Sequence, residues 1–576
     1  MIYGMQFVQQ FTNTTLLTRS PMTRYIQFLI VMALTIRFSY GQEINPANTF
    51  TEDSLKVVEK VYLHLDRDSY YPGDDIWFKA YLIDGSGRLL SSNSKNLHVE
   101  LISPSTEIIG SRVIRVEEGL GHGDFHLSDS LKSGRYRLRA YTNYMRNFGT
   151  ELFFSRNIII INTRDTDKSL IEGEGEVIDK PELYFFPEGG SLVDNVVSNV
   201  AFKAIDPQGK GYDVSGGVYS SANEKITDLK STHAGMGIFS LEPKAGLRYY
   251  ATIKNRSGET FRYEIPTGFS TGIVLSVVKN QDGELLLVFR TNPGTLKSVM
   301  NHDFSLTASD HSAGLKTYTF RMKSLNSFLN LPTDDLPDGI IKLTLSGADG
   351  IPLCERLVFL QEAEDTKLTL ETNKTLFNKR DSVSVKINLS DSSGLSPEAF
   401  LSLSATDSIF ADNSSRFPTT ISSWFLLESD IRGKIEDPSY YFDPANPNRL
   451  KDLDVLLLTQ GWRDFEWKYK TMKYPPEYGF TISGKARKKF SDSPLKNTTI
   501  TLALFGKEKP LITMTSADST GKFHIDEIDF SGEAKLIASI TDDKDNLKGL
   551  LILDSIRYKP PVPAEGVALK LSLIHI

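Results

Sequence analysis

The segment His122, Asp124 and His126 places three potential metal ligands at alternate positions. Residues two apart face the same side of a β-strand, so a strand here would bring two imidazoles and a carboxylate together, as a transition-metal site requires. The segment also lies within a repeated Gly-x-Phe pattern whose other copies carry different side chains at these positions. We therefore expect the three side chains to face solvent, without a bound metal.

A second group of candidate ligands comprises Asp66, Asp68, Asp74 and Asp75, and calcium binds carboxylate oxygens of this kind. The segment lacks a calcium loop with ligands at alternate positions that ends in a bidentate Glu. We interpret the four residues as exposed carboxylates around a turn. In the stretch 70–74, YYPGD, Pro fixes φ and Gly supplies the permissive position, and we expect Trp77 and the residues at period two from it to enter a core.

Nucleophilic and hydrolytic chemistry has little support in the sequence. The single cysteine, Cys354, lies in the apolar run IPLCERLVFL and is predicted to be a buried structural thiol. The sequence contains no Gly-x-Ser-x-Gly, His-Glu-x-x-His or phosphate-loop motif. A triad of distant residues leaves no such motif, so an enzyme stays the last of the hypotheses. We predict no catalytic, cofactor-binding or metal-ligating residues, and no cofactor.

Composition indicates a globular, multi-domain chain. The 576 residues exceed what one core accommodates, and hydrophobic residues make up 40% while charged residues make up 24%. The formal net charge of −7 supplies no basic field for a phosphate backbone, so a nucleic-acid partner is excluded.

The N-terminal segment carries the features of a secretory signal. Arg24 precedes the apolar run 25–36, YIQFLIVMALTI, and Ser39-Tyr40-Gly41 offers a small-x-small cleavage pattern before Gln42. The run is shorter than a bilayer-spanning helix, and no Cys follows it to carry a lipid anchor. We expect an exported protein whose start is Met22 or Met1, with a buried amphipathic helix as the alternative.

Beyond residue 42 the sequence predicts an all-β fold. Short runs rich in branched residues alternate with Gly, Asp, Asn, Ser and Pro clusters, as in antiparallel sandwiches; examples are 97–103, 157–161, 284–289 and 382–389. A Gly-x-Phe-x-aliphatic pattern begins at Gly123, Gly237 and Gly521, and each copy precedes another Gly and a strand. We expect the glycine to permit the turn, and Phe and the aliphatic residue to face inward. Three copies imply tandem β modules, which we expect to be immunoglobulin-like antiparallel β-sandwiches.

The predicted organisation has seven parts, with one helical insertion near 450–460. In that insertion Leu450, Leu453, Leu457 and Leu458 follow helical spacing, Gly461 ends the helix, and we expect it to pack on a sheet rather than dock a partner. The parts are an N-terminal extension with signal peptide (1–41), sandwiches at 52–162, 181–266, 272–362, 366–467 and 478–558, and a tail that we expect to be truncated (559–576).

The stretch LDRDSYYPGDDIWFKAYLID resembles the strand-turn-strand signature of macroglobulin (MG-type, MG2-like) domains of the α-macroglobulin family. The residues that carry the resemblance are Asp66, Tyr70, Pro72, Gly73, Asp74, Trp77 and Phe78. The resemblance implies that the tandem sandwiches are macroglobulin-like. A fainter copy spans 371–391, where Asn378 and Lys379 replace Pro and Gly. The family's covalent trapping uses a Cys-Gly-Glu-Gln thioester, which Cys354-Glu355-Arg356-Leu357 does not match, so covalent trapping is not expected.

Other phrases are similar to those of large exported envelope proteins of Gram-negative bacteria. They are FFPEGGSLV (185–193), LRAYTNYMRN (138–147), IEDPSYYF (435–442) and LDVLLLTQGWRDFEW (453–467). The segment that begins TISGKARKKFSDSPLKNTTITL (481–502) and includes Ser519-Thr520-Gly521-Lys522-Phe523 resembles carboxypeptidase-regulatory-like sandwiches, which often precede the plug of a TonB-dependent receptor.

Three functions follow as hypotheses. The first is a non-enzymatic exported scaffold or binding protein of the cell envelope, in the periplasm or at the outer membrane, whose protein partner adds to exposed sheet edges. The second is the extracytoplasmic part of a TonB-dependent receptor system, with membrane association through a missing C-terminal region. The third is a thioester-less endopeptidase inhibitor with a bait segment at 411–420, ADNSSRFPTT.

Overall fold

The computed structural model describes most of the chain from residue 58 onward. The described residues are 3–4, 45–46, 58–85, 89–165, 180–281, 283–310, 314–361, 366–407, 415–431, 433–461, 473–506, 509–530, 532–541, 549–554 and 561. The predicted signal segment 25–36 lies outside them, as does the predicted tail apart from residue 561. Within the described part of the chain, no helix is long and apolar enough to cross a bilayer.

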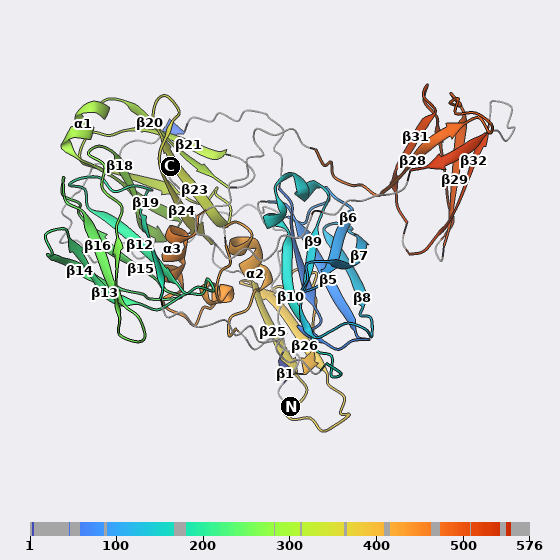
Figure 1. Ribbon diagram of the computed structural model, residues 1–576, viewed down its shortest axis with the longest axis horizontal. Helices are drawn as coiled ribbons and strands as arrows, with labels where there is room; N and C mark the ends of the chain where they lie inside the picture. Colours follow the sequence, from blue (N-terminus) through green and yellow to red (C-terminus); the bar gives the residue numbers. More distant parts are fainter. Residues whose placement is uncertain are drawn as a thin grey trace.

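The first sandwich follows residue 58 and pairs a three-stranded with a five-stranded sheet (Figure 1). The smaller sheet has the order β3 (Lys60–Leu65), β5 (Asp75–Ile83), β8 (Leu120–His126). The larger has the order β4 (Ser69–Tyr70), β10 (Phe154–Ile160), β9 (Gly134–Tyr141), β6 (Asn96–Ile102), β7 (Ile108–Arg115), and the 3-10 helices η1 (Tyr144–Asn147) and η2 (Thr150–Leu152) follow β9. Only β4 and β10 run parallel among the described strand pairs.

The second and third sandwiches are built in the same way. The second packs β11 (Glu182–Pro187), β12 (Ser198–Ile205) and β15 (Met236–Leu241) on β14 (Lys225–Lys230), β13 (Ser215–Ser220), β16 (Tyr249–Lys254) and β17 (Thr260–Glu264). The third packs β18 (Ile273–Gln281), β19 (Glu284–Thr291) and β22 (Asn326–Pro332) on β2 (Asn45–Pro46), β21 (Gly314–Arg321), β20 (Asp303–Ser309), β23 (Gly339–Ser346) and β24 (Pro352–Leu360), and α1 (Pro293–Val299) follows β19.

A C-terminal sandwich lies apart from the others in Figure 1. Its sheets are β31 (Lys522–Ile528), β28 (Phe480–Arg487), β33 (Leu550–Leu553) and β30 (Leu511–Ser516), β29 (Thr499–Phe505), β32 (Lys535–Thr541). Its apolar core includes Ile500, Leu502 and Phe523. The all-β prediction is confirmed, because tandem antiparallel sandwiches account for nearly all of the described regular structure.

Between the third and the C-terminal sandwich the chain changes character. The described part of the predicted sandwich 366–467 contains the antiparallel pair β25 (Thr366–Thr372) and β26 (Val385–Asp391), and β27 (Thr406–Asp407) paired with β1 (Tyr3–Gly4). It also contains α2 (Ile421–Ser423), the π-helical η5 (Trp424–Glu428), the 3-10 helix η6 (Pro438–Phe442) and α3 (Arg449–Thr459). The domain boundaries themselves stay predictions.

The individual strand predictions are confirmed. The four runs at 97–103, 157–161, 284–289 and 382–389 correspond to β6, β10, β19 and β26. The repeat is confirmed as well, since Phe125, Phe239 and Phe523 are all buried and each copy leads into a further strand, β9, β16 or β32.

The role assigned to the repeat's glycine is right in one copy and wrong in two. Gly521 has φ +77° and forms the predicted turn. Gly123 and Gly237 lie inside strands, where a Cβ atom would come within 2.8 Å of the Phe78 ring and 2.5 Å of the Phe202 ring, respectively. In these copies glycine leaves room for an aromatic ring from the neighbouring strand.

The prediction that Trp77 enters the core is wrong. Trp77 is 57% exposed, whereas Ile76 and Phe78 on the opposite face of β5 are buried. Trp77 shares its face with Lys79 and lies opposite Asp124 of β8. Because these neighbours are charged, burial of this part of the face would cost more than exposure of one indole. Further along the same face Tyr81 and Ile83, at period two from Trp77, are buried as predicted.

Candidate functional site

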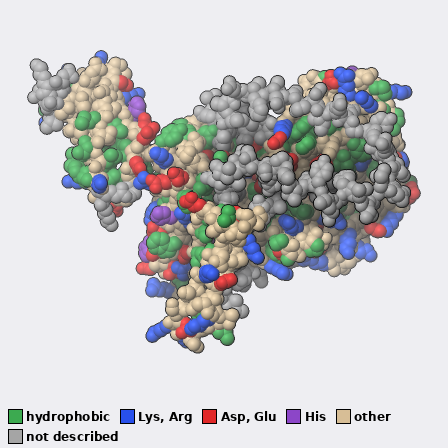
Figure 2. Space-filling model, turned by 180° about the vertical axis from the view of Figure 1, so that it is seen from behind, with side chains coloured by type: hydrophobic (Ala, Val, Ile, Leu, Met, Phe, Trp, Pro, Cys, Tyr) green, Lys and Arg blue, Asp and Glu red, His purple; other side chains and the backbone are tan. Residues whose placement is uncertain are grey.

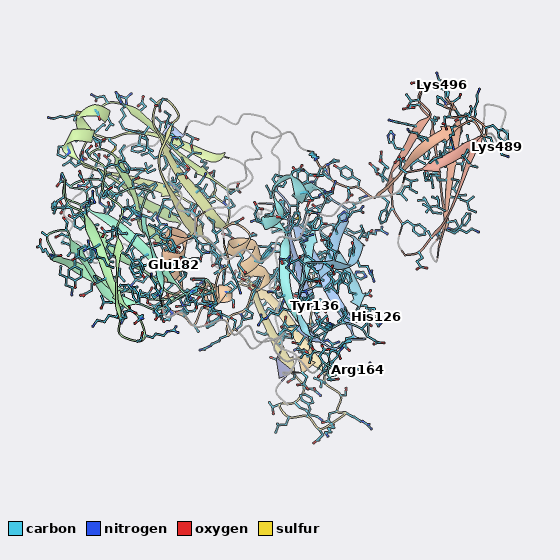
Figure 3. The ribbon with its side chains drawn as sticks, in the orientation of Figure 1. His126, Tyr136, Arg164, Glu182, Lys489 and Lys496 are labelled. Carbon is cyan, nitrogen blue, oxygen red and sulfur yellow. The ribbon has the colours of Figure 1, made fainter. Side chains whose placement is uncertain are left out.

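The predicted metal-ligating segment lies on the exposed side of β8. His122, Asp124 and His126 all face solvent, as predicted, and His126 is seen at the edge of the first sandwich in Figure 3. Its Nδ1 lies 2.8 Å from an Asp75 carboxylate oxygen on the adjacent β5. Across the described residues, no group of three or more His, Cys, Asp or Glu side chains is arranged to hold a metal ion. The arrangement shows one surface His–Asp contact rather than a ligand cage.

The predicted turn closes as expected. The Asp74 amide donates to the Tyr71 carbonyl over 3.1 Å, and Gly73 has φ +87°. Asp66 joins the two sides of the turn, since its Oδ1 accepts hydrogen bonds from the Tyr70 hydroxyl at 2.8 Å and from the Trp77 amide at 3.0 Å. The Asp66 and Asp74 carboxylates therefore stabilise the turn.

Asp68 corrects the interpretation of four exposed carboxylates. It is 6% exposed and pairs with Arg156 of β10, whose side chain also lies inside the sandwich. Burial lowers the pKa of Arg156, but Asp68 together with Tyr62 and Tyr70 raises it by more, so the pKa of Arg156 is raised overall. This pair ties β10 to the segment before β4 and has a structural role.

Cys354 is buried in β24, as predicted. Burial raises the pKa of its thiol, with a smaller contribution from Glu355. A thiol with a raised pKa is protonated at neutral pH and is a poor nucleophile.

A buried carboxylate that the sequence did not single out lies at the start of β3. Glu59 is 1% exposed and accepts from the hydroxyls of Thr142, Ser94 and Ser91 at 2.6, 2.8 and 2.9 Å. Burial raises its pKa, and the three hydroxyls act against that rise. Three donors enclose the carboxylate, so it joins β3 to two loops and has no access to a substrate.

A group of helices, which we name the helical hub (residues 421–459), joins distant parts of the chain. It comprises α2, η5, η6 and α3, and its side chains enter two separate apolar cores. α2 begins with a capping box, in which Thr420 Oγ1 accepts from the Ser423 amide at 3.1 Å. The hub lies at the centre of Figure 1, between the first three sandwiches.

One end of the hub completes the first sandwich. The ring of Trp424 packs edge-on against Phe154, and its Nε1 donates to the Val61 carbonyl of β3 over 2.7 Å. Lys60 of β3 forms a buried ion pair with Asp430 at 2.7 Å. Residues about 365 positions apart in sequence therefore share one core.

The other end joins the second and third sandwiches through a buried arginine. Arg356 of β24 donates from Nε to Glu188 at 3.0 Å and from a terminal nitrogen to Asp454 of α3 at 2.6 Å. Arg356 and Glu188 are 3% and 1% exposed, respectively. Nearby, Lys203 of β12 donates to the Gln460 side chain at 2.9 Å. Three elements from distant parts of the chain thus converge on one guanidinium.

The helix prediction around 450–460 is confirmed, including its packing on a sheet. Leu453 and Leu457 of α3 are buried against side chains of β15, β23 and β24. Leu450, which was expected on the packed face, is 55% exposed. It lies in the first turn of α3, before the helix reaches the sheets.

The segment that leaves β26 also contacts the first sandwich. His64 of β3 is 4% exposed, with Nδ1 2.7 Å from the Ser402 hydroxyl and Nε2 3.3 Å from that of Ser404. Burial lowers the pKa of His64 to about 4; Arg156 adds to the effect and Asp68 opposes it. His64 is therefore a neutral packing group at pH 7.

A pocket of about 750 Å³ opens between the hub and the β25–β26 pair. Hydroxyl groups from Ser390, Thr420 and Ser439 line it together with the rings of Phe417 and Phe442. It holds no cluster of acids, bases or nucleophiles arranged for catalysis among the described residues.

The candidate bait segment is partly described. Residues 411–414 lie outside the described part of the chain. In the remainder, Ser415 donates to Asp437 at 2.5 Å, the ring of Phe417 packs against Tyr440, and Thr420 caps α2. Residues 415–420 are therefore anchored to the hub.

Comparison with known families identifies one part of the chain. The family model described as the MG2 domain matches residues 60–153. These residues form an MG2 domain. It corresponds to most of the first sandwich, including the turn at Pro72–Gly73 that carries the resemblance seen in the sequence.

Similarity to solved structures is distant. The chain is 11% identical to Escherichia coli alpha-2-macroglobulin activated by porcine elastase, with 86% of this chain and 43% of that chain covered and a TM-score of 0.21. For Salmonella alpha-2-macroglobulin reacted with methylamine the identity is 12%, with 88% of this chain and 40% of that chain covered and a TM-score of 0.16. For dimeric latent PorU from Porphyromonas gingivalis the identity is 11%, with 52% of this chain and 34% of that chain covered and a TM-score of 0.24.

The chain thus spans about two fifths of the length of these alpha-2-macroglobulins. No curated protein matches it. The MG2 domain is therefore the part with an assigned family.

The residues that organise the molecule escaped sequence reasoning. Arg356, Trp424 and Asp430 lie in unremarkable segments, and their partners are far away along the chain. The one available signal was charge within an apolar run, since Arg356 interrupts the buried strand β24. A charged residue in a buried strand indicates a partner from another element.

Proposed function

We propose that this chain is a non-enzymatic scaffold of the bacterial cell envelope, which holds a protein partner against its sandwiches. The observation that supports the proposal most strongly is the helical hub. Its buried contacts with the MG2 domain and with the second and third sandwiches fix three modules in one arrangement. A fixed arrangement presents loops and sheet edges with little loss of conformational entropy on binding.

The placement of charged groups agrees with this role. The buried ionic groups Glu59, Asp68, Arg356 and Asp430 contact one another or polar groups of the chain within the described structure. Each of them joins two elements. Their chemistry is used for assembly, which leaves partner recognition to exposed side chains and backbone edges.

Export and envelope location rest on the sequence features of residues 25–42 and belong to the same proposal. A fusion of the full chain to a C-terminal tag, expressed in a Gram-negative host, tests them. We expect shortening of the chain after about residue 41 and recovery with the periplasmic or outer-membrane fraction. Full-length protein in the cytoplasmic fraction would contradict export.

The scaffold role is tested with the mature chain from Gln42 as bait in an envelope extract, with chemical cross-linking before purification. We expect one or a few proteins to be retained at constant stoichiometry, and to be lost when Arg356→Ala loosens the hub. The exposed Arg321→Ala variant, which removes a surface ion pair with Asp303, serves as the matched control. Equal retention by Arg356→Ala and the unmodified chain would overturn the role of the fixed arrangement.

A further inference from the structure

The segment that leads into the C-terminal sandwich lies on the MG2 domain, and we name it the strap (residues 473–479, KYPPEYG). Figure 1 shows an extended segment that runs from the first sandwich to the C-terminal sandwich. Four backbone carbonyls of the strap accept hydrogen bonds from groups 327 to 383 positions earlier in the chain; they belong to Tyr474, Pro475, Glu477 and Gly479. The strap is thus held largely through its backbone acceptors.

The composition of the strap favours this mode of binding. Pro475 and Pro476 have no amide hydrogen and a fixed φ, so they keep the segment extended and leave its carbonyls without partners inside the segment. Because such a segment has few conformations to lose, less entropy is lost when it binds. A surface that recognises it must offer hydrogen-bond donors.

The MG2 domain offers such donors in the stretch LRAYTNYMRN (138–147), which the sequence had already singled out. Asn147 Oδ1 accepts from the Lys473 and Tyr474 amides, each at 2.9 Å. Its Nδ2 donates to the Tyr474 carbonyl at 2.6 Å. One amide side chain therefore binds the backbone at the start of the strap from both sides.

The neighbouring residues of η1 bind the next position and one side chain. Asn143 donates from Nδ2 to the Pro475 carbonyl at 3.0 Å. Arg146 orients that amide, because it donates to Asn143 Oδ1 at 2.9 Å. The Arg146 guanidinium also lies 4.0 Å from the centre of the Tyr474 ring, a cation–π contact that favours an aromatic residue before the prolines.

The start of β6 binds the other end of the strap. The Lys95 amide and the Asn96 side chain donate to strap carbonyls at 2.7 and 3.0 Å. His98 is 4% exposed, stacks on the Tyr141 ring, and has its Nε2 2.7 Å from the Glu477 carboxylate. A buried imidazole held by an aromatic ring thus selects a carboxylate after the prolines.

The C-terminal sandwich itself is weakly tied to its neighbours. No described strand of it pairs with another sandwich, and its apolar core contains only its own residues. Arg115 of β7 lies 2.8 Å from Asp529, but both side chains are nearly half exposed, and such pairs contribute little. Figure 2 shows this sandwich joined to the body over a narrow neck with charged side chains. Beyond the sandwich, Arg139 donates to the Pro561 carbonyl at 2.8 Å, on the same domain as the strap.

We propose that the MG2 domain carries a recognition site for an extended segment that has two prolines, an aromatic residue before them and a carboxylate after them. Asn143, Arg146 and Asn147 form one end of the site, and His98 forms the other. The strap occupies the site within the same chain and thereby holds the C-terminal sandwich in place. The site is independent of the proposed scaffold function, because its occupant belongs to the same chain.

The direct test uses the full chain with the strap replaced by a glycine-serine linker of equal length, which empties the site. A fluorescein-labelled peptide KYPPEYG is titrated against this linker variant and against the unmodified chain. We expect saturable binding to the linker variant and at least tenfold weaker binding to the unmodified chain, whose own strap competes. Equal binding to both chains, or binding to neither, overturns the proposal.

Two asparagine substitutions in the linker variant locate the site. Asn147→Ala removes three hydrogen bonds to the peptide and is expected to weaken binding at least tenfold. Asn157→Ala makes the same change at an exposed position of β10 and is the control, with an expected effect below about twofold. Equal affinities of the two variants refute the assignment.

A change in the peptide tests the site independently of how the variants fold. Alanine in place of both prolines keeps the carbonyls and the two recognised side chains but makes the free peptide more flexible. We expect about three- to tenfold weaker binding to the linker variant. Undiminished binding would show that the prolines are not recognised and would contradict the proposal.

Fluorescence energy transfer tests the hold on the C-terminal sandwich. Labels are attached at Ser111→Cys of β7 and Ser491→Cys of the C-terminal sandwich, both exposed positions, while Cys354 is buried away from the reagent. We expect a narrow distribution of transfer efficiency for the chain with its strap and a broader one with the linker. Arg115→Ala, which breaks the exposed ion pair, should keep it narrow. A distribution unchanged by the linker would overturn the role of the strap in holding the sandwich.

Sedimentation distinguishes a strap bound within one chain from a strap exchanged between two copies. We expect the unmodified chain and the linker variant to sediment as the same species. A dimer of the unmodified chain that dissociates in the linker variant would place the strap on a second copy and overturn its binding within one chain.

Discussion

The helical hub and the β25–β26 pair, which we name the ribbon (residues 366–391), are near each other in sequence and opposite in character. The hub buries Trp424, Phe425 and Leu427 against other modules, and it neutralises charges through the buried pairs of Lys60 and Arg356. The ribbon leaves Leu376 86% exposed and has no strand at its outer edges within the described structure. Internal contacts therefore cover most of the hub, whereas the tip of the ribbon stays exposed to solvent.

The largest expected loss of folding stability comes from Arg356→Ala. Removal of the guanidinium leaves Glu188 buried without its ionic partner, which costs about 3–5 kcal/mol. Denaturant unfolding followed by hydrogen exchange in β24 and α3 measures the loss. The control, Arg321→Ala, breaks an exposed pair, for which we expect less than about 1 kcal/mol. Equal losses in the two variants would show that the hub is no more constrained than the surface.

A pH dependence is expected where the chain leaving the ribbon covers His64. The folded-state pKa of about 4 lies below the ordinary 6.5, so the unfolded chain binds the proton first as pH falls. Stability is therefore complete above pH 6.5 and declines toward pH 4, by about 2 kcal/mol between pH 7 and 5. Hydrogen exchange of β3 and β5 at the two pH values reports it. His64→Gln should abolish this decline, and the exposed His122→Gln should preserve it.

The capping box of α2 is expected to contribute less to the free energy of unfolding than Arg356 or His64. Thr420→Ala removes the acceptor for the Ser423 amide and should cost about 1 kcal/mol. The denaturation midpoint of the MG2 domain and hub measures it. At the ribbon tip, Thr375→Ala makes the same chemical change at an exposed site, where we expect less than about 0.5 kcal/mol. A reversed order of the two effects would contradict the contrast between the regions.

The smallest effect is expected for Leu376→Ser at the ribbon tip. Since this side chain is already exposed in the folded chain, stability should change by less than about 0.5 kcal/mol. Thermal unfolding measures it, with the buried Leu427→Ser of η5 as the destabilised counterpart. A large loss for Leu376→Ser would show that another part of the chain covers the ribbon.

Local patterns in the sequence predicted local structure well. The turn at Pro72–Gly73, the repeat phenylalanines, and helix α3 all follow from residue types within a few positions. Trp77 was misplaced because both faces of β5 carry large apolar residues, and only the charged Asp75 and Lys79 on either side of Trp77 mark that part of its face as exposed. Alternation alone does not decide register when both faces are apolar.

Long-range pairing is what the sequence did not reveal. The sandwich predicted at 366–467 rests on the fainter signature copy at 371–391, which contains β26 but does not specify what covers that strand. The contacts of Trp424 and Arg356 join residues from distant modules, and no local feature encodes such a choice. A charged residue inside an apolar strand, as at Arg356, is the sequence signal that indicates a partner from another element.

The hub has a consequence for the order in which the molecule folds. The MG2 domain needs Trp424 and Phe425 to complete its core, and the bond from Lys60 to Phe425 spans 365 residues. At synthesis rates of 5–20 residues per second, roughly 20 to 70 seconds separate the two segments on the ribosome. The MG2 domain is thus completed only after the hub has been made, and until then its core lacks Trp424 and Phe425 and is open to chaperones and proteases.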